Sequence, residues 1–109
     1  FTNKKADLTT TNLTSVYTVP TATTAIIKSI LVSEDAGSGT TIDVTLVDSS
    51  SNIFNLFKTK AISSNTTVEL LTQPLVLEES EILKVQAADA NELHVIVSIL
   101  EVKPREVTT

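Results

Sequence analysis

The stretch Val16–Val32, with the sequence VYTVPTATTAIIKSILV, predicts the fold more directly than any other part of the chain. A short alternating strand ends at Pro20, because proline has no amide hydrogen to donate to a strand ladder. A long aliphatic strand, Ala25–Ser33, begins a few residues later. Since β-branched residues pack well on a pleated sheet and lose rotamer freedom in helices, this stretch indicates two consecutive strands joined by a turn.

The same pattern continues along the rest of the chain. Short runs of alternating apolar and polar residues are separated by polar turns, and the cleanest run directs Ile42, Val44 and Leu46 inward. The expected strands are Thr14–Val19, Ala25–Ser33, Thr40–Val47, Ile53–Lys60, Thr66–Leu71, Leu75–Leu77, Ile82–Ala87 and Leu93–Val102. About eight short strands of even spacing predict an all-β fold, a single antiparallel two-sheet β-sandwich that is either immunoglobulin-like or jelly-roll-like.

The length of 109 residues fits one domain with one hydrophobic core. We expect the sandwich domain to occupy residues 1–109, with an extended N-terminal arm at about residues 1–12 and a short C-terminal tail at about residues 104–109. We interpret both segments as loosely held. The candidate docking residues in and beside the N-terminal arm are Phe1, Leu8 and Leu13.

Two of the expected strands carry aliphatic residues on both faces. Regular alternation in Ala25–Ser33 would place Ile26, Ile30 and Val32 on one face and Ile27 and Leu31 on the other. A sandwich buries only one face of each sheet, so something else must cover the second face. Loops or the N-terminal arm could do so, but large apolar patches usually mark association sites, and we favour a subunit interface. The candidate interface residues are Ile27, Leu31, Ile96, Leu100 and Val102.

Charge and composition argue against several kinds of partner. A net charge of −5 with eight scattered basic residues does not supply the clustered cations that bind a nucleic-acid backbone or an anionic membrane. No run approaches the roughly 20 apolar residues of a membrane-spanning helix. Because the chain has no cysteine, it has no disulfide framework, thiol nucleophile or thiolate metal site.

Residues with catalytic or ligand-binding chemistry are few. The single histidine, His94, lacks an obvious nucleophile and orienting carboxylate, and we interpret it as a surface or interface residue. The carboxylates of Glu34, Asp35 and Asp43, and those of Glu78, Glu79 and Glu81, lack the pattern of a calcium loop and are interpreted as solvated turn charge. We therefore expect no enzyme activity, no metal and no cofactor.

A resemblance adds a functional expectation. The stretch quoted above and the closing segment Leu75–Val102, LVLEESEILKVQAADANELHVIVSILEV, resemble a family of small β-sandwich virion proteins of tailed bacteriophages, of the marine and cyanophage type. Family members carry a Gly-Asp pair in the closing segment, where this chain has Glu79-Ser80-Glu81. The resemblance implies a non-enzymatic particle component, and a capsid decoration or cement protein fits it best.

The resemblance also implies partners and a location. We expect a homo-oligomer, for example a trimer, that contacts other virion proteins such as the major capsid protein. The start of the chain, FTNKKADL, is too polar for a signal peptide, so we expect assembly in the cytoplasm of the bacterial host. Two alternatives stay open: a neck, tail or fibre component, and an adhesin that binds host glycans. Tyr17, Phe54 and Phe57 are the only aromatic residues besides Phe1, so an aromatic sugar platform would be small.

Overall fold

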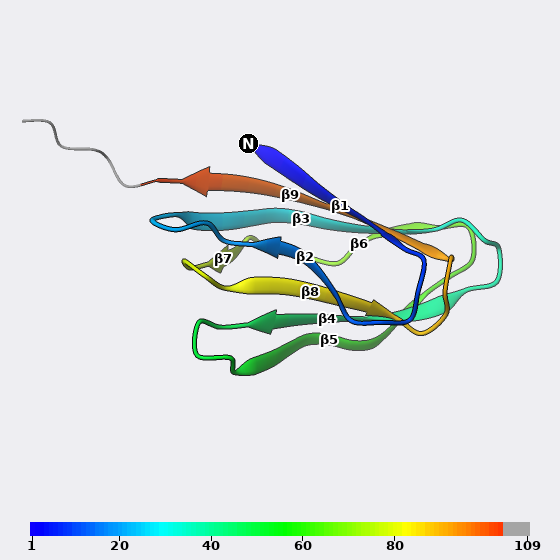
Figure 1. The fold of residues 1–109 in the computed structure, drawn as a ribbon. Coiled ribbons are helices and arrows are strands. Elements are labelled where there is room, and N and C mark those ends of the chain that lie inside the picture. The colour runs from blue at the N-terminus through cyan, green and yellow to red at the C-terminus, as the bar shows by residue number, and fades with distance from the viewer. Residues whose placement is uncertain (104–109) are drawn as a thin grey trace, which may run out of the picture.

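The structure is a computed structural model that describes residues 1–103. They form nine antiparallel strands in two facing sheets (Figure 1). The strands are β1 (Thr2–Leu8), β2 (Thr14–Thr18), β3 (Thr24–Glu34), β4 (Thr40–Val47), β5 (Ile53–Ile62), β6 (Thr67–Glu69), β7 (Leu75–Leu77), β8 (Ile82–Ala87) and β9 (Leu93–Val102). Within this part of the chain, no helix is long and apolar enough to cross a membrane.

The strand order is that of a jelly roll. The five-stranded sheet has the order β1-β9-β3-β6, and β7 pairs with β3 further along; the four-stranded sheet has the order β2-β8-β4-β5. The pairs are therefore nested, because β4 pairs with β5, β3 with β6 and β7, β2 with β8, and β1 with β9. This nesting is the double Greek key of a jelly roll, which resolves the choice that the sequence left open.

All eight expected strands are present, and the β-sandwich is confirmed. The strands Thr40–Val47, Leu75–Leu77, Ile82–Ala87 and Leu93–Val102 match the expectation at both ends. The ninth strand, β1, overturns one expectation. Residues Thr2–Leu8 pair with β9 along their whole length, so this part of the expected N-terminal arm is an edge strand and is not loosely held. The expected tail at residues 104–109 lies outside the described residues.

A bulge in β3 corrects the assignment of its faces. Ile27 pairs with Ile99, but Ser29 pairs with Ser98, so β3 has one more residue, Lys28, than the β9 segment it faces. An extra residue in one strand shifts the alternation of side chains by one position. As a result Ile27 is fully buried together with Ile30, whereas regular alternation would have put these two residues on opposite faces.

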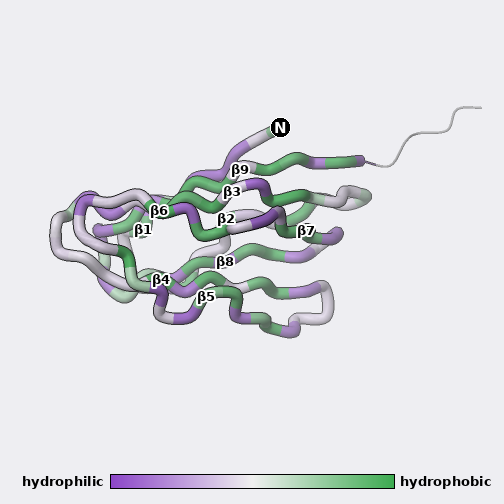
Figure 2. Tube along the Cα trace, turned by 180° about the vertical axis from the view of Figure 1, so that it is seen from behind, coloured by the Kyte–Doolittle hydropathy of each residue, from purple (hydrophilic) through white to green (hydrophobic). Residues whose placement is uncertain are grey.

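The core lies between the sheets and is aliphatic. It takes alternate residues of β9 and β8 and both halves of β3, as well as Ile42 and Val44 of β4, as expected. Leu46, the third residue of β4 expected to point inward, is partly buried against this core. Figure 2 shows the long hydrophobic stretches that run along β3 and β9. The buried core residues contributed by β3 and β9 are Ala25, Ile27, Ile30, Val32, Leu93, Val95, Val97 and Ile99. The sandwich is thus complete without the aliphatic residues on the opposite face of the same two strands.

Candidate functional site

The outer face of the five-stranded sheet carries the second aliphatic surface. Directly paired residues on neighbouring antiparallel strands point to the same face, so the register defines rows of outward side chains. Three rows carry most of the large side chains. The charged row is Lys5, Ile96, Leu31 and Glu69; the histidine row is Asp7, His94, Ser33 and Thr67; and the aliphatic row is Leu100, Ile26 and Val76.

Four of the five predicted interface residues lie on this outer face. Ile96 is 39% exposed and Val102 is 47% exposed, while Leu31 and Leu100 are partly exposed. Ile27 is the exception, because the bulge at Lys28 turns it into the core, where its exposed fraction is 0%. The prediction was wrong for this residue.

Two residues of the outer face were not predicted. Ile26 was assigned to the opposite face for the same reason that Ile27 was misplaced. Val76, which is 56% exposed, joins the face because the short strand β7 pairs with β3 at Ile26. No feature of the sequence marks the bulge residue Lys28, so local alternation alone could not have found Ile26.

The three residues of the predicted docking arm differ in exposure. Phe1 and Leu13 are exposed, but Leu8 is 2% exposed and belongs to the core. The backbone N–H of Asn91 also donates to the carbonyl of Leu8 at 2.9 Å. Leu8 therefore stabilises the end of β1 against the sandwich and is not a docking residue.

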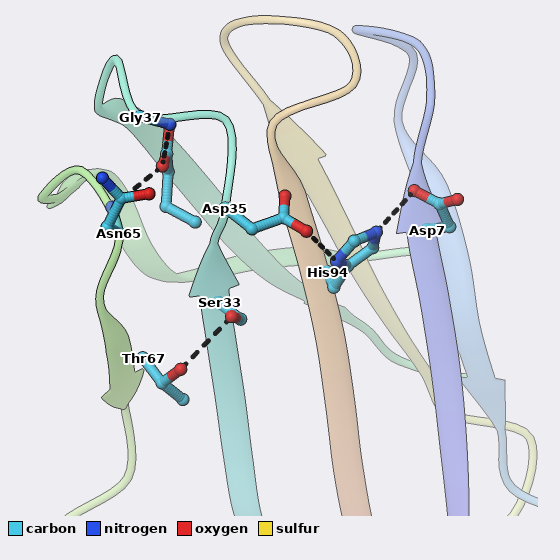
Figure 3. Close-up of polar contacts among 8 residues, drawn as sticks. Asp7, Ser33, Asp35, Gly37, Asn65, Thr67 and His94 are labelled. Atoms are coloured by element: carbon cyan, nitrogen blue, oxygen red, sulfur yellow. Dashed lines mark hydrogen bonds and ion pairs between the residues drawn. The ribbon is translucent and has the colours of Figure 1, made fainter.

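His94 lies between two carboxylates, of which Asp7 belongs to the histidine row and Asp35 lies just beyond β3. Its Nε2 is 3.2 Å from Oδ1 of Asp7, and its Nδ1 is 3.4 Å from Oδ2 of Asp35 (Figure 3). All three side chains are about half exposed or more, as expected for a surface or interface histidine. A shallow depression of about 390 Å³, lined by Lys5, His94 and Ile96 among others, lies over this row. The ionisable side chains of this site therefore border the aliphatic surface at one end of the sheet.

Glu34 was interpreted as solvated turn charge, which is wrong. It is buried at the end of β3, and its carboxylate accepts hydrogen bonds from the backbone N–H groups of Gly37, Ser38, Gly39 and Asn65 at 3.0, 3.2, 2.9 and 3.1 Å. Burial would raise the pKa of this carboxyl, but the backbone donors outweigh burial and lower the pKa to about 2. The carboxylate is committed to holding two loops together, which no local sequence pattern reveals.

The acidic turn of Glu78, Glu79 and Glu81 is organised by its own backbone. The N–H of Glu78 donates to Oε1 of Glu81 at 2.7 Å, and the N–H of Glu81 donates to the carbonyl of Glu78 at 3.1 Å. Among residues 1–103 no group of three His, Cys, Asp or Glu side chains is arranged to hold a metal ion.

Two other carboxylates support the five-stranded sheet. Glu69 accepts hydrogen bonds from the hydroxyl of Ser29 and, at 2.8 Å, from the N–H of Ile30, so it holds the β3 bulge. Burial opposes ionisation of Glu69, but these donors and others lower its pKa. The hydroxyl of Tyr17 donates to Oε2 of Glu101 at 2.6 Å, and burial together with this contact raises the pKa of the buried Tyr17 ring. Tyr17 is thus a core residue and is not part of a sugar platform.

The outer face of the four-stranded sheet is different. Its central rows pair Asp43 with Gln86 and Thr45 with Lys84, and aliphatic side chains gather only at one end, where Val47 pairs with Ile82. A depression of about 490 Å³ lies on this face. Polar side chains dominate its centre.

Comparisons with known proteins add no assignment. No family model matches the sequence, and no curated protein matches it at a significant level.

Proposed function

We propose that this protein is a non-enzymatic structural component of a tailed-phage virion, and that it acts as a capsid decoration or cement protein. The observation that carries the proposal is the aliphatic outer face of the five-stranded sheet, because folding of the sandwich leaves it open. Exposed aliphatic patches of this kind mark association sites. The resemblance of both ends of the sequence to phage virion proteins supplies the setting.

The distribution of polar groups supports a structural role. The single histidine has carboxylates, Asp7 and Asp35, on both of its ring nitrogens, whereas nucleophilic catalysis needs a hydroxyl or thiol on one of them. The carboxylate of Glu34, whose pKa is lowered to about 2, is buried and saturated by backbone donors. Jelly rolls occur in viral capsid proteins and in lectins, so the fold is compatible with this role without specifying it.

The test is to locate the chain in purified particles of the phage that encodes it. An antibody raised against the folded protein, followed by immunogold labelling and quantitative mass spectrometry, should detect it on the head in a copy number that is a simple fraction of the major capsid protein. Labelling confined to the neck, tail or fibres would replace the decoration role with the alternative position. Absence from particles would overturn the proposal.

A second candidate is an adhesin that binds host glycans. It is favoured by the depression on the four-stranded sheet, where Asp43, Asn55 and Gln86 provide hydrogen-bonding side chains. A glycan array probed with the purified protein tests it directly. A specific signal that disappears in Asn55→Ala would favour the adhesin role, whereas an array without signal would remove it.

A further inference from the structure

We propose that two copies of this chain form a symmetric dimer through the outer face of the five-stranded sheet, with a twofold axis parallel to β3 and β9 and midway between them. The inference rests on the proposed role of this face as a contact surface and names its partner. It is carried by the order of charged and aliphatic side chains across the strands.

The charged row has opposite charges at its two ends. Lys5 on β1 pairs with Ile96 on β9, Ile96 with Leu31 on β3, and Leu31 with Glu69 on β6. When a second copy packs face to face about an axis along the strands, the order of this row is reversed. Lys5 of one copy then lies opposite Glu69 of the other, twice, and Ile96 lies opposite Leu31. Complementary charges of this kind favour one orientation and disfavour others.

The neighbouring rows fit the same operation. In the aliphatic row, Leu100 comes opposite Ile26 of the second copy, so aliphatic surface meets aliphatic surface. In the histidine row, His94 comes opposite Ser33 and Asp7 comes opposite Thr67, so polar side chains meet polar side chains.

An axis across the strands fits poorly. If it passed through the charged row, Lys5 would lie opposite Lys5, and Glu69 opposite Glu69. The row of Asn3, Ser98 and Ser29 lies between the charged row and the aliphatic row. If the axis passed through this row, Glu69 would lie opposite Val76, and a charge would be buried against an aliphatic side chain. Like charges in contact and unpaired buried charges are both unfavourable. An axis midway between the charged row and the histidine row would place Lys5 opposite Asp7, but it would leave the aliphatic row beyond the ends of the partner's strands. Of these axes, only the one parallel to the strands both pairs the charges and covers the aliphatic row.

The net charge and the area of the outer face both suit a weak dimer. The chain carries a net charge of −5, but on the outer face of these strands the exposed Lys5 and Lys28 balance Asp7 and Glu69, and Asp35 at the rim adds one further negative charge. Four strand positions about 4.8 Å apart and on average roughly eight residues long cover on the order of 500 Å² per copy. A standard interface buries about 800 Å² per partner, so we expect dissociation in the micromolar range.

Charge exchange tests the orientation. Lys5→Glu and Glu69→Lys should each weaken the dimer by about tenfold or more in sedimentation equilibrium, because each places like charges opposite one another. A mixture of the two variants should form a heterodimer close to wild type in affinity, since a carboxylate of one variant then faces an ammonium group of the other at both contacts. Asn55→Lys, on the other sheet, should change nothing. A wild-type chain that stays monomeric at high micromolar concentration would overturn the proposal.

Cross-linking gives an answer that does not depend on Glu69, which also holds the β3 bulge. Because the chain has no cysteine, Asp7→Cys and Thr67→Cys each introduce a unique thiol, at opposite edges of the face. A short bismaleimide should join the two variants to each other more efficiently than it joins either variant to itself, because Asp7 lies opposite Thr67 of the second copy, whereas two equal edge positions are offset by three strand spacings, about 14 Å. Efficient Asp7→Cys homodimers alone would point to a crossed axis and contradict the proposal. A dimer with this geometry in a chain absent from virions would refute the proposed function and leave the dimer standing.

Discussion

The outer faces of the two sheets differ, although both sheets bury the same kind of side chain inside. On the four-stranded sheet, Asp43, Thr45, Lys84 and Gln86 alternate with core residues, which is the usual pattern of a sandwich strand in water. On the five-stranded sheet, large aliphatic side chains occupy about half of the outward positions of β3 and β9. Since both inner faces pack one core, the difference does not arise from the packing of that core. It is the basis for the proposal that the five-stranded sheet contacts another molecule.

The largest expected effect concerns the strand that completes the aliphatic face. Deleting residues 1–8 removes β1, exposes the edge of β9 and takes Leu8 out of the core. The loss of Leu8 burial, about 2–3 kcal/mol, and of a ladder of hydrogen bonds worth about 1 kcal/mol each should abolish cooperative unfolding or lower the melting temperature steeply. Circular dichroism during heating measures this.

Removal of Phe1 alone is the matched control. This side chain is 88% exposed and precedes the strand, so its loss should leave the melting temperature unchanged. A well-folded protein without residues 1–8 would show that β1 is dispensable and that the segment is an arm after all.

The next effect separates the two faces of one strand. Ile27→Ala should destabilise the fold by about 2–5 kcal/mol, because it leaves a cavity in the core. Ile26→Ala, one residue away on the outer face, should lower stability by about 1 kcal/mol or less and should instead weaken self-association. Urea unfolding and sedimentation equilibrium measure the two quantities. Equal destabilisation by both variants would mean that the bulge at Lys28 is misplaced.

A smaller effect is the loss of folding stability in acid, which involves neither outer face. The pKa of Glu34 is lowered to about 2 from an ordinary value of about 4.5, against the influence of burial, by its backbone donors. A group with a lowered folded-state pKa stabilises the fold above its unfolded pKa, and this contribution is lost as the pH falls toward the folded pKa. The urea concentration at the midpoint of unfolding should therefore decrease as the pH is lowered from about 4.5 to about 2.

Glu34→Gln should lower the urea midpoint at neutral pH and flatten its dependence on acid, without changing the dimer at pH 7. Glu79→Gln, an exposed carboxylate in the turn before β8, is the control and should keep the wild-type slope. An unchanged acid slope in Glu34→Gln would assign the acid sensitivity to other groups, such as Glu69.

The alternation of neighbouring residues was sufficient to predict most of the strands. It did not predict any feature that depends on contacts between distant segments. Thr40–Val47 and Leu93–Val102 could be predicted because their alternation is encoded in consecutive residues. β1 could not, because an edge strand with Lys4 and Lys5 needs little apolar character, and only its pairing with β9 orders it. Two other features depend on segments far apart in sequence and appear only in the folded chain. They are the bulge at Lys28 and the hydrogen bond from the N–H of Asn65 to the carboxylate of Glu34.

The nested strand order also has a consequence for biosynthesis. β9 is the partner of both β1 and β3, so the five-stranded sheet cannot assemble until residues 93–102 have left the ribosome. Folds dominated by such distant pairings form slowly, and strands that wait with unpaired edges are prone to aggregate. β3, with aliphatic side chains on both faces, is the segment most exposed to this risk. During synthesis, the yield of native protein should therefore decrease as the concentration of incomplete chains, which lack their last strand, increases.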